Sequence, residues 1–281
     1  MDLIDTHQHL ILRDRLGYAW TRGIPALAQR SFTPLDYAAE RRGRRVAASI
    51  VMECAVDDAD WRREARIVAG LVGRDGIVGQ VASCRPESDE GFEAWLDEGP
   101  SLGVLGYRRV LHVVPDAVAM DPTLRRNLKA LGRRGLPFDL CFHARQLGGP
   151  ALDLVRDCDG QALVLDHCGC PEIGAGGFGP WARDVAALAR HEHLACKLSG
   201  LTAYCAPGPH DAATLLPYVE HVLDRFGPDR VMWGSDWPVA DLGAGLAGWM
   251  DLTAELLAGL SQDERDRVAQ GTARRVYRPP L

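Results

Sequence analysis

The chain has 281 residues, of which 47% are hydrophobic and 25% charged, as is typical of a globular protein with a sizeable core. Its formal net charge of -6 argues against a nucleic-acid partner, which would favour a basic face. There is no apolar stretch of roughly 20 residues and no secretory signal, and the eight cysteines include no Cys-x-x-Cys pair, so we expect a cytoplasmic protein without a membrane partner.

Short apolar, β-branched segments predict eight strands, and amphipathic segments between them predict helices. The predicted strands cover residues 3–6, 46–54, 77–81, 103–110, 137–143, 162–167, 194–198 and 231–236. The predicted helices cover residues 34–42, 59–69, 88–96, 122–131, 150–156, 180–190, 211–225, 246–257 and 261–270. Thr33 with Asp36, and Ser261 with Glu264, form predicted capping boxes.

Residues 11–31 carry Tyr18 and Trp20 but no regular pattern. Irregular stretches of this length are usually functional or disordered. Two interpretations stay open at this point: a lid over a pocket, or packing of the aromatic rings against the surface.

The alternation of strands and helices predicts an α/β protein with a parallel sheet covered by helices. Eight such units in this length are typical of a single (β/α)8 barrel of the TIM type, which need not be regular. An open, doubly wound sheet is the alternative. No Gly-x-Gly-x-x-Gly follows the first strand, so we expect no dinucleotide and no other organic cofactor. Without an internal repeat or linker, residues 1–281 are predicted to form one domain.

Polar side chains stand where the predicted strands end, which is where the active site of such a barrel lies. These residues are His7, His9, Glu53, Arg108, Arg109, His143, His167, Ser199 and Asp236. Neighbouring strand residues point to opposite faces, so one of Arg108 and Arg109 faces inward. The remaining histidines, including His112, are expected in loops or helices without a role in the site.

Five segments give the chain a family resemblance. They read DTHQHL at 5–10, FDLC at 138–141, LDHCG at 165–169, KLSGL at 197–201 and GSDWPV at 234–239. Together with the histidines after strands one, five and six and the aspartate after strand eight, they resemble the amidohydrolase superfamily. The sequences of these segments are most similar to those of its lactonase branch, which contains sugar-lactone hydrolases and, more distantly, pyrone-dicarboxylate lactonase. The resemblance runs along nearly the whole chain.

The resemblance implies a site for one metal ion and not for two. Binuclear members carry a lysine on strand four, and residues 103–110 contain none, so at most one divalent metal is expected. His7, His9, His143 and Asp236 are its implied ligands. Neutral imidazoles and a carboxylate suit zinc or manganese. Some members of the branch work without metal, so the sequence leaves open whether the metal is dispensable.

The resemblance also implies hydrolysis of a small sugar-acid lactone, and hence a role in carbohydrate metabolism. Asp236 is expected to take a proton from the attacking water. His7, His9 and His167 would polarise the lactone carbonyl, directly or through the metal. A Gly-x-Arg pattern on strand four favours Arg108 for substrate binding. Further candidates for substrate contact are Arg145, Trp237, Glu53 and Ser199.

Two other functions stay open from the sequence. A metal-dependent decarboxylase of the same superfamily would use similar histidines and an aspartate, and His143 fits that function well. A barrel that only binds a sugar acid or metal is the third hypothesis. The partner is expected to be a small molecule. Outer helices of a barrel can pair or not without an obvious sign, so the sequence does not decide whether the chain forms a homo-oligomer.

Overall fold

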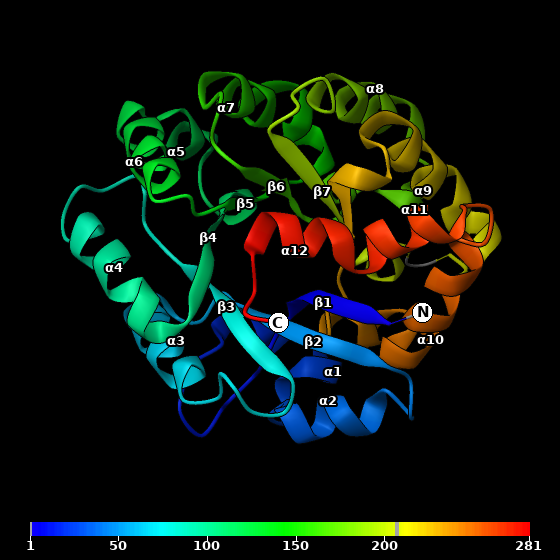
Figure 1. Cartoon of the computed structure of the whole chain (residues 1–281), viewed down its shortest axis with the longest axis horizontal. Helices are drawn as coiled ribbons and strands as arrows, with labels where there is room; N and C mark the ends of the chain where they lie inside the picture. Colours follow the sequence, from blue (N-terminus) through cyan, green and yellow to red (C-terminus); the bar gives the residue numbers. More distant parts are fainter. Residues whose placement is uncertain (1, 206–207) are drawn as a thin grey trace.

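Eight parallel strands follow one another in chain order around a barrel (Figure 1). The computed structural model describes residues 2–205 and 208–281. The strands are β1 (Leu3–Gln8), β2 (Val46–Met52), β3 (Ile77–Ser83), β4 (Val104–Val110), β5 (Phe138–Cys141), β6 (Leu163–Leu165), β7 (Leu194–Leu198) and β8 (Val231–Trp233). The predicted (β/α)8 fold is confirmed, and the open doubly wound alternative is wrong, because such a sheet does not run in sequential order.

The seam between β8 and β1 is bridged by the residues that follow β8. The backbone N–H of Asp236 donates to the carbonyl of His7 at 2.8 Å, and that of His9 donates to the carbonyl of Trp237 at 2.7 Å. The barrel is therefore nearly closed. The same two bonds place the predicted acid of the last strand beside the two histidines of the first.

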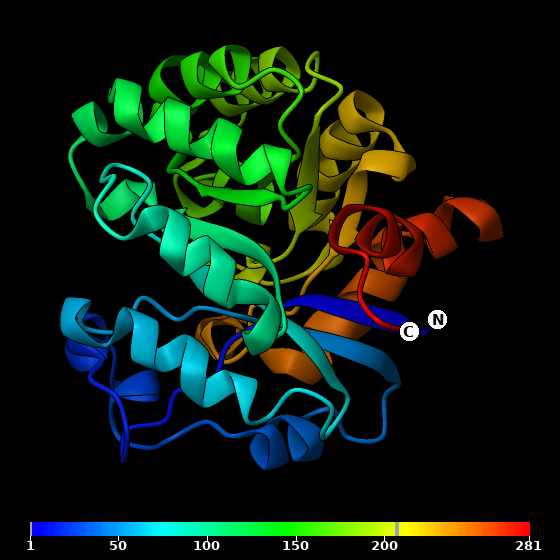
Figure 2. The same ribbon diagram turned by 60° about the vertical axis from the view of Figure 1, so that its left-hand side comes forward.

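Helices surround the strands in a ring (Figures 1 and 2). They are α1 (Pro25–Ala28), α2 (Pro34–Glu40), α3 (Trp61–Ala69), α4 (Phe92–Glu98), α5 (Asp116–Met120), α6 (Pro122–Arg133), α7 (Leu152–Asp157), α8 (Phe178–Leu188), α9 (Ala212–Phe226), α10 (Gly245–Leu256), α11 (Gln262–Asp266) and α12 (Thr272–Tyr277). Both predicted capping boxes are present. Within the described ranges, no helix has the length and apolar character needed to cross a bilayer.

The last helix, α12, lies across the end of the barrel at which the strands begin (Figure 1). Its Ala273 packs with Ile4 and Ala48, near the start of β1 and β2, and its Tyr277 enters the apolar interior. The predicted helix over 261–270 was too short, because a π-helical turn (Arg267–Gly271) continues it into α12. This helix closes one end of the barrel, which leaves the opposite end for the site.

Two strand ends differ from the prediction in a way that affects the site. β5 ends at Cys141, so His143 belongs to the following loop, where it caps a short 3-10 turn. β8 ends at Trp233, and Asp236 lies in the next loop with a positive φ of 57°. The apolar Phe142 made β5 look longer in the sequence, whereas no apolar side chain stands between the end of β8 and Asp236.

The segment 11–31 is folded onto the barrel. Ile11 pairs with Phe32 in an isolated bridge, and a 3-10 turn, η1 (Ala19–Gly23), precedes α1. Tyr18 is buried, whereas Trp20 is 37% exposed. The two aromatic residues therefore have different environments, and only Trp20 stays at the surface.

Candidate active site

Three histidines and one aspartate meet at the carboxyl end of the barrel. Nε2 of His9 lies 3.4 Å from Oδ1 of Asp236, and Nε2 of His7 lies 3.9 Å from the same oxygen. Nδ1 of His167 lies 3.9 Å from the other carboxylate oxygen, Oδ2. All four side chains are buried. The first, sixth and eighth strands thus deliver their predicted polar residues to one place.

The protonation of His9 follows from its neighbours. Its Nδ1 lies 3.1 Å from the carbonyl oxygen of Met52. A carbonyl only accepts hydrogen bonds, so Nδ1 carries a hydrogen. In the neutral ring, Nε2 then presents a lone pair toward the carboxylate of Asp236. A cation between these two atoms, either a proton or a metal ion, resolves the contact.

His167 is held by a sharp turn and a hydroxyl. The chain after β6 enters the left-handed region at His167 itself, with a φ of 52°. Its Nδ1 lies 2.9 Å from Oγ of Ser199. Gly200 has a φ of +69°, and a Cβ there would come within 2.7 Å of His167 Nδ1 and 2.8 Å of Asp236 Oδ2. A glycine is therefore required where the loop after β7 passes these two side chains.

Burial sets the charge state of two of the histidines. It lowers the pKa of His7 well below the usual 6.5, an effect that nearby Asp166 only partly opposes. It also lowers the pKa of His167. Both rings are therefore neutral near pH 7 and able to act as a hydrogen-bond partner or a metal ligand.

Arg108 ties the cluster to a buried layer of charges beneath it. Its Nε donates to Oε1 of Glu53 at 2.6 Å, and its Nη2 donates to the carbonyl of Glu53 at 2.7 Å. Its Nη1 lies 3.2 Å from both Oδ2 of Asp166 and Nε2 of His7. Burial alone would raise the pKa of Glu53, but the guanidinium holds it below its ordinary value. Four of the five N–H groups of Arg108 are thus engaged within the protein.

A fully buried lysine completes this layer. Lys197 on β7 forms an ion pair with Asp139 on β5, and its Nζ lies 3.3 Å from Oδ1 of Asp166 and 3.4 Å from Nδ1 of His7. Burial raises the pKa of Asp139 to about 6, against the opposing charge of Lys197. The hydroxyl of Tyr277 donates to Asp139, at 2.7 Å from Oδ2. A chain of polar contacts therefore runs from α12 up to the ring of His7.

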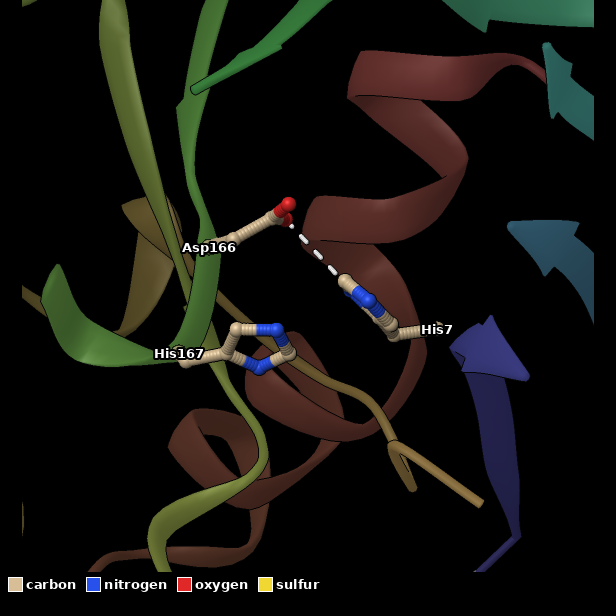
Figure 3. A group of neighbouring side chains, drawn as sticks. All are labelled: His7, Asp166 and His167. Atoms are coloured by element: carbon tan, nitrogen blue, oxygen red, sulfur yellow. Dashed lines mark ion pairs between the residues drawn. The ribbon is translucent and has the colours of Figure 1, made fainter. Parts of the chain in front are cut away.

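Two groups of side chains have the composition and spacing of a metal site. One contains His7, Asp166 and His167 (Figure 3), and the other contains His7, His9 and Asp236. In the first group, Lys197 already places a cation beside His7 Nδ1 and Asp166 Oδ1. The second group has the unpaired nitrogen of His9 and suits a divalent metal better, although Arg108 competes for Nε2 of His7.

The charge balance also suits a cation. Among the described residues, the buried cationic side chains are Arg108 and Lys197, and the buried acids are Asp5, Glu53, Glu64, Asp139, Asp166 and Asp236. A low-dielectric interior disfavours unpaired negative charge, so either protons or a metal ion must compensate for the excess. The residues present therefore fit one divalent ion bound through two imidazoles and a carboxylate.

His143 lies outside both groups in the described part of the chain. Its ring stacks on that of His112, with centroids 4.3 Å apart. The structure thus brings together three of the four residues expected as metal ligands, and it does not bring His143 to them. The end of β5 at Cys141 is the reason, since it moves His143 into the loop.

The residues expected to contact substrate have different positions. Arg108 faces inward and lines the cavity, as favoured, while Arg109 faces outward to Glu87. Ser199 contacts His167 and Glu53 contacts Arg108, and neither Ser199 nor Glu53 is among the residues that line the cavity. Arg145 is exposed and is not among the residues that line the cavity.

Trp237 is fully buried away from the cavity, in the part of the chain that the structure describes. Its indole N–H donates to Glu40 on α2 at 2.7 Å, and its ring contacts those of Phe32 and Tyr37. Trp237 therefore anchors the loop after β8 to the helical shell, and the structure gives no support to a contact between its ring and a substrate.

A cavity of about 300 Å³ opens above the cluster. Its lining residues are His9, Trp20, Cys54, Ala55, Arg108, Val110, His112, Val113, Cys141, His167, Asp236 and Val239. This volume is at the lower end of the range for small-molecule sites. Trp20 comes from the segment 11–31, so this segment contributes one wall of the cavity.

Reasoning from the sequence missed several residues of the site. Lys197 and Asp139 stand alone as charges inside apolar strands, and a charge at such a position is rarely buried without a partner. This signal was available. His112 lines the cavity although it was expected to have no role there, and no local pattern marks it.

Comparison with known proteins shows the family of the chain. The amidohydrolase family profile matches residues 4–278. The chain belongs to this family. It is 31% identical to an L-fucono-1,5-lactonase of Burkholderia ambifaria, over 98% of this chain and 95% of the relative. A 4-sulfomuconolactone hydrolase of Rhizobium radiobacter is 35% identical over 47% of this chain and 52% of its own length.

Among solved structures, an amidohydrolase of Burkholderia multivorans with bound zinc superposes with a TM-score of 0.89. It is 27% identical in sequence, and the match covers 100% of both chains. The family membership implied by the five sequence segments is thus confirmed. The zinc is a property of that relative. In this chain, His7, His9 and Asp236 are candidates for holding a metal ion.

Proposed function

We propose that this amidohydrolase is a lactone hydrolase that adds water across the ring ester of a small lactone. The observation that carries the proposal is the carboxylate of Asp236, which lines the cavity between His9 and His167. The relatives named for lactone hydrolysis support the same chemistry.

Asp236 is the general base of the proposed reaction. Its carboxylate takes a proton from a water molecule as the water oxygen bonds to the lactone carbonyl carbon. The bond between that carbon and the ring oxygen then breaks, and the leaving alkoxide takes the proton back from Asp236. The product is an open-chain hydroxy acid, and atoms and charge balance without a further reactant.

His167 and Arg108 are the proposed partners of the developing oxyanion. If the hydroxyl of Ser199 donates to Nδ1 of His167, the hydrogen of the neutral ring is on Nε2 and can donate to the carbonyl oxygen. The N–H of Arg108 that has no partner among the described residues is the second donor. His7 is fully buried, so its proposed role is to position the other groups or bind a metal.

One divalent metal, zinc or manganese, is proposed to be held by His7, His9 and Asp236. When bound, such an ion polarises the carbonyl and lowers the pKa of water. The lone pair that His9 directs at Asp236 supports this assignment.

The test is acid release from a panel of 1,4- and 1,5-lactones, followed with a pH indicator after subtraction of spontaneous hydrolysis. The proposal predicts release of one acid equivalent for each lactone consumed, and release at least about 100-fold slower by Asp236→Asn. If every lactone is left intact while an aromatic carboxylic acid releases carbon dioxide, the protein is a decarboxylase and the proposal is wrong.

A further inference from the structure

The outer walls of the active-site cavity are apolar. They are formed by the indole of Trp20, Ala55 and three valines, Val110, Val113 and Val239. These residues come from four separate places in the chain: the segment after β1, the loop after β2, the end of β4 with its following turn, and the turn after β8. The apolar surface therefore surrounds the mouth of the site.

The polar groups of these walls already have partners inside the protein. The indole N–H of Trp20 donates to the carbonyl of Cys54 at 3.0 Å. Nδ1 of His112 lies 3.2 Å from Sγ of Cys141. Arg108 retains one N–H after its contacts with Glu53, Asp166 and His7. Within the described residues, the side-chain groups left for recognition beside the reacting cluster are this N–H and Nε2 of His112.

This shortage of free hydrogen-bond donors and acceptors limits the class of substrate that the cavity can bind. A sugar lactone carries three or four ring and side-chain hydroxyls, and each hydroxyl that packs against the apolar wall loses water on that side, although Trp20 and Val113 at the mouth remain partly open to solvent. A buried hydroxyl without a partner costs roughly tenfold or more in affinity. An alkyl group against the same wall gains roughly tenfold for each methylene. Two recognition groups are enough for the ester of a lactone but not for a set of hydroxyls.

We infer that the preferred substrate is a small lactone with an apolar alkyl or aryl substituent, rather than a polyhydroxylated sugar lactone. This inference rests on the proposed lactone hydrolysis and adds the substrate class to it. The reacting ester lies over Asp236, and the substituent packs against Trp20, Val113 and Val239. The inferred substrate class thus differs from the sugar lactone in the name of the L-fucono-1,5-lactonase relative.

The experiment compares kcat/KM for δ-octalactone, unsubstituted δ-valerolactone, D-glucono-1,5-lactone and L-fucono-1,5-lactone. We expect δ-octalactone to exceed both sugar lactones by about 100-fold or more, with δ-valerolactone between them. A sugar lactone that is hydrolysed faster than δ-octalactone would overturn the inference and leave lactone hydrolysis intact.

Calorimetric measurement of lactone binding to Asp236→Asn separates the inferred substrate preference from the proposed lactone hydrolysis. If wild type hydrolyses no lactone, the lactonase function fails. Tighter binding of δ-octalactone than of the sugar lactones to the variant would still support the apolar preference of the cavity. Absence of binding by every lactone would overturn both statements.

Variants of the wall test the physical cause. Val239→Thr and Val113→Thr are nearly isosteric and each add one hydroxyl to a wall that is not fully buried. Either is expected to shift the ratio of kcat/KM for δ-octalactone over L-fucono-1,5-lactone about tenfold toward the sugar lactone. Val46→Thr at the start of β2, at the opposite end of the barrel, is the matched control. An unchanged ratio in both wall variants would contradict the inference.

Discussion

Nε2 of His9 lies 3.4 Å from Oδ1 of Asp236, while Nδ1 of the same ring is committed to the carbonyl of Met52. The neutral imidazole therefore directs a lone pair at a carboxylate, which is repulsive unless a cation lies between the two atoms. Either a proton or a metal ion can fill that position. The arrangement makes Asp236 and His9 one functional unit, and the predictions below begin from it.

Asp236→Asn is expected to lower kcat by about 10²–10⁴-fold, because an amide cannot take a proton from water. The fold and the binding of lactone should be retained, since the side chain keeps its shape. Steady-state kinetics and calorimetry measure the two effects. Asp224→Asn, at an exposed position on α9, is the control for the loss of a carboxylate. Near wild-type turnover in Asp236→Asn would exclude this residue as the base.

His9→Gln is expected to weaken zinc binding at least about tenfold, because it removes one of three ligands. His143→Gln should leave zinc affinity unchanged, because His143 lies outside the candidate groups of the described residues. Competition with a coloured chelator gives both affinities. The reverse result, with loss of zinc in His143→Gln only, would return His143 to the ligand set and contradict this arrangement.

Arg108→Gln is expected to lower the free energy of unfolding by about 3–5 kcal/mol, because it leaves Glu53 as a buried, unpaired charge. The adjacent Arg109 pairs with Glu87 in a partly exposed position, and Arg109→Gln should cost no more than about 1 kcal/mol. Urea unfolding of the two variants gives the comparison. Equal losses would mean that the buried position of Arg108 has no energetic consequence.

Glu64 gives the folded protein a pH-dependent stability. Its Oε1 accepts from the N–H of Cys54 at 2.8 Å, and its Oε2 is buried and has no partner within the described residues. Burial, with the nearby charge of Glu53, raises the pKa of Glu64 well above 4.5. The folded protein thus keeps a proton that the unfolded chain releases near pH 4.5.

The stability due to Glu64 is consequently fully present below pH 4.5 and is lost as the pH rises through the higher folded pKa. The slope is at most about 1.4 kcal/mol for each pH unit. Glu64→Gln keeps the acceptor for Cys54 but does not titrate, so its free energy of unfolding should fall less with rising pH. Urea unfolding from about pH 5 to about pH 9, with exposed Glu255→Gln as control, measures this slope. Parallel curves for wild type and Glu64→Gln would contradict the assignment.

The barrel and the clustering of the polar residues at its carboxyl end could be predicted from the sequence because parallel strands bring their carboxyl ends to one edge. The order of apolar segments was enough for the fold, and the polar residue after a strand was enough for His7, His9, His167 and Asp236. Alternation along β4 predicted that only one of Arg108 and Arg109 faces inward, and the Gly-x-Arg resemblance favoured Arg108.

Other features depend on loops and on long-range packing, which local patterns do not encode. The early end of β5 moves His143 away from the cluster, and the loop after β8 turns Trp237 toward α2. Tyr277 reaches Asp139 only because α12 folds back across the barrel. No spacing in the sequence relates these distant residues, so their partners became visible only in three dimensions.

Hydrolysis of a lactone in water enriched with oxygen-18 tests the central claim most directly. Attack of water, deprotonated by Asp236, on the carbonyl carbon predicts that the label enters the carboxyl group of the hydroxy acid, and that Asp236→Asn forms almost no labelled product. Label in the product hydroxyl group, or carbon dioxide from an aromatic acid with no lactone consumed, would contradict it.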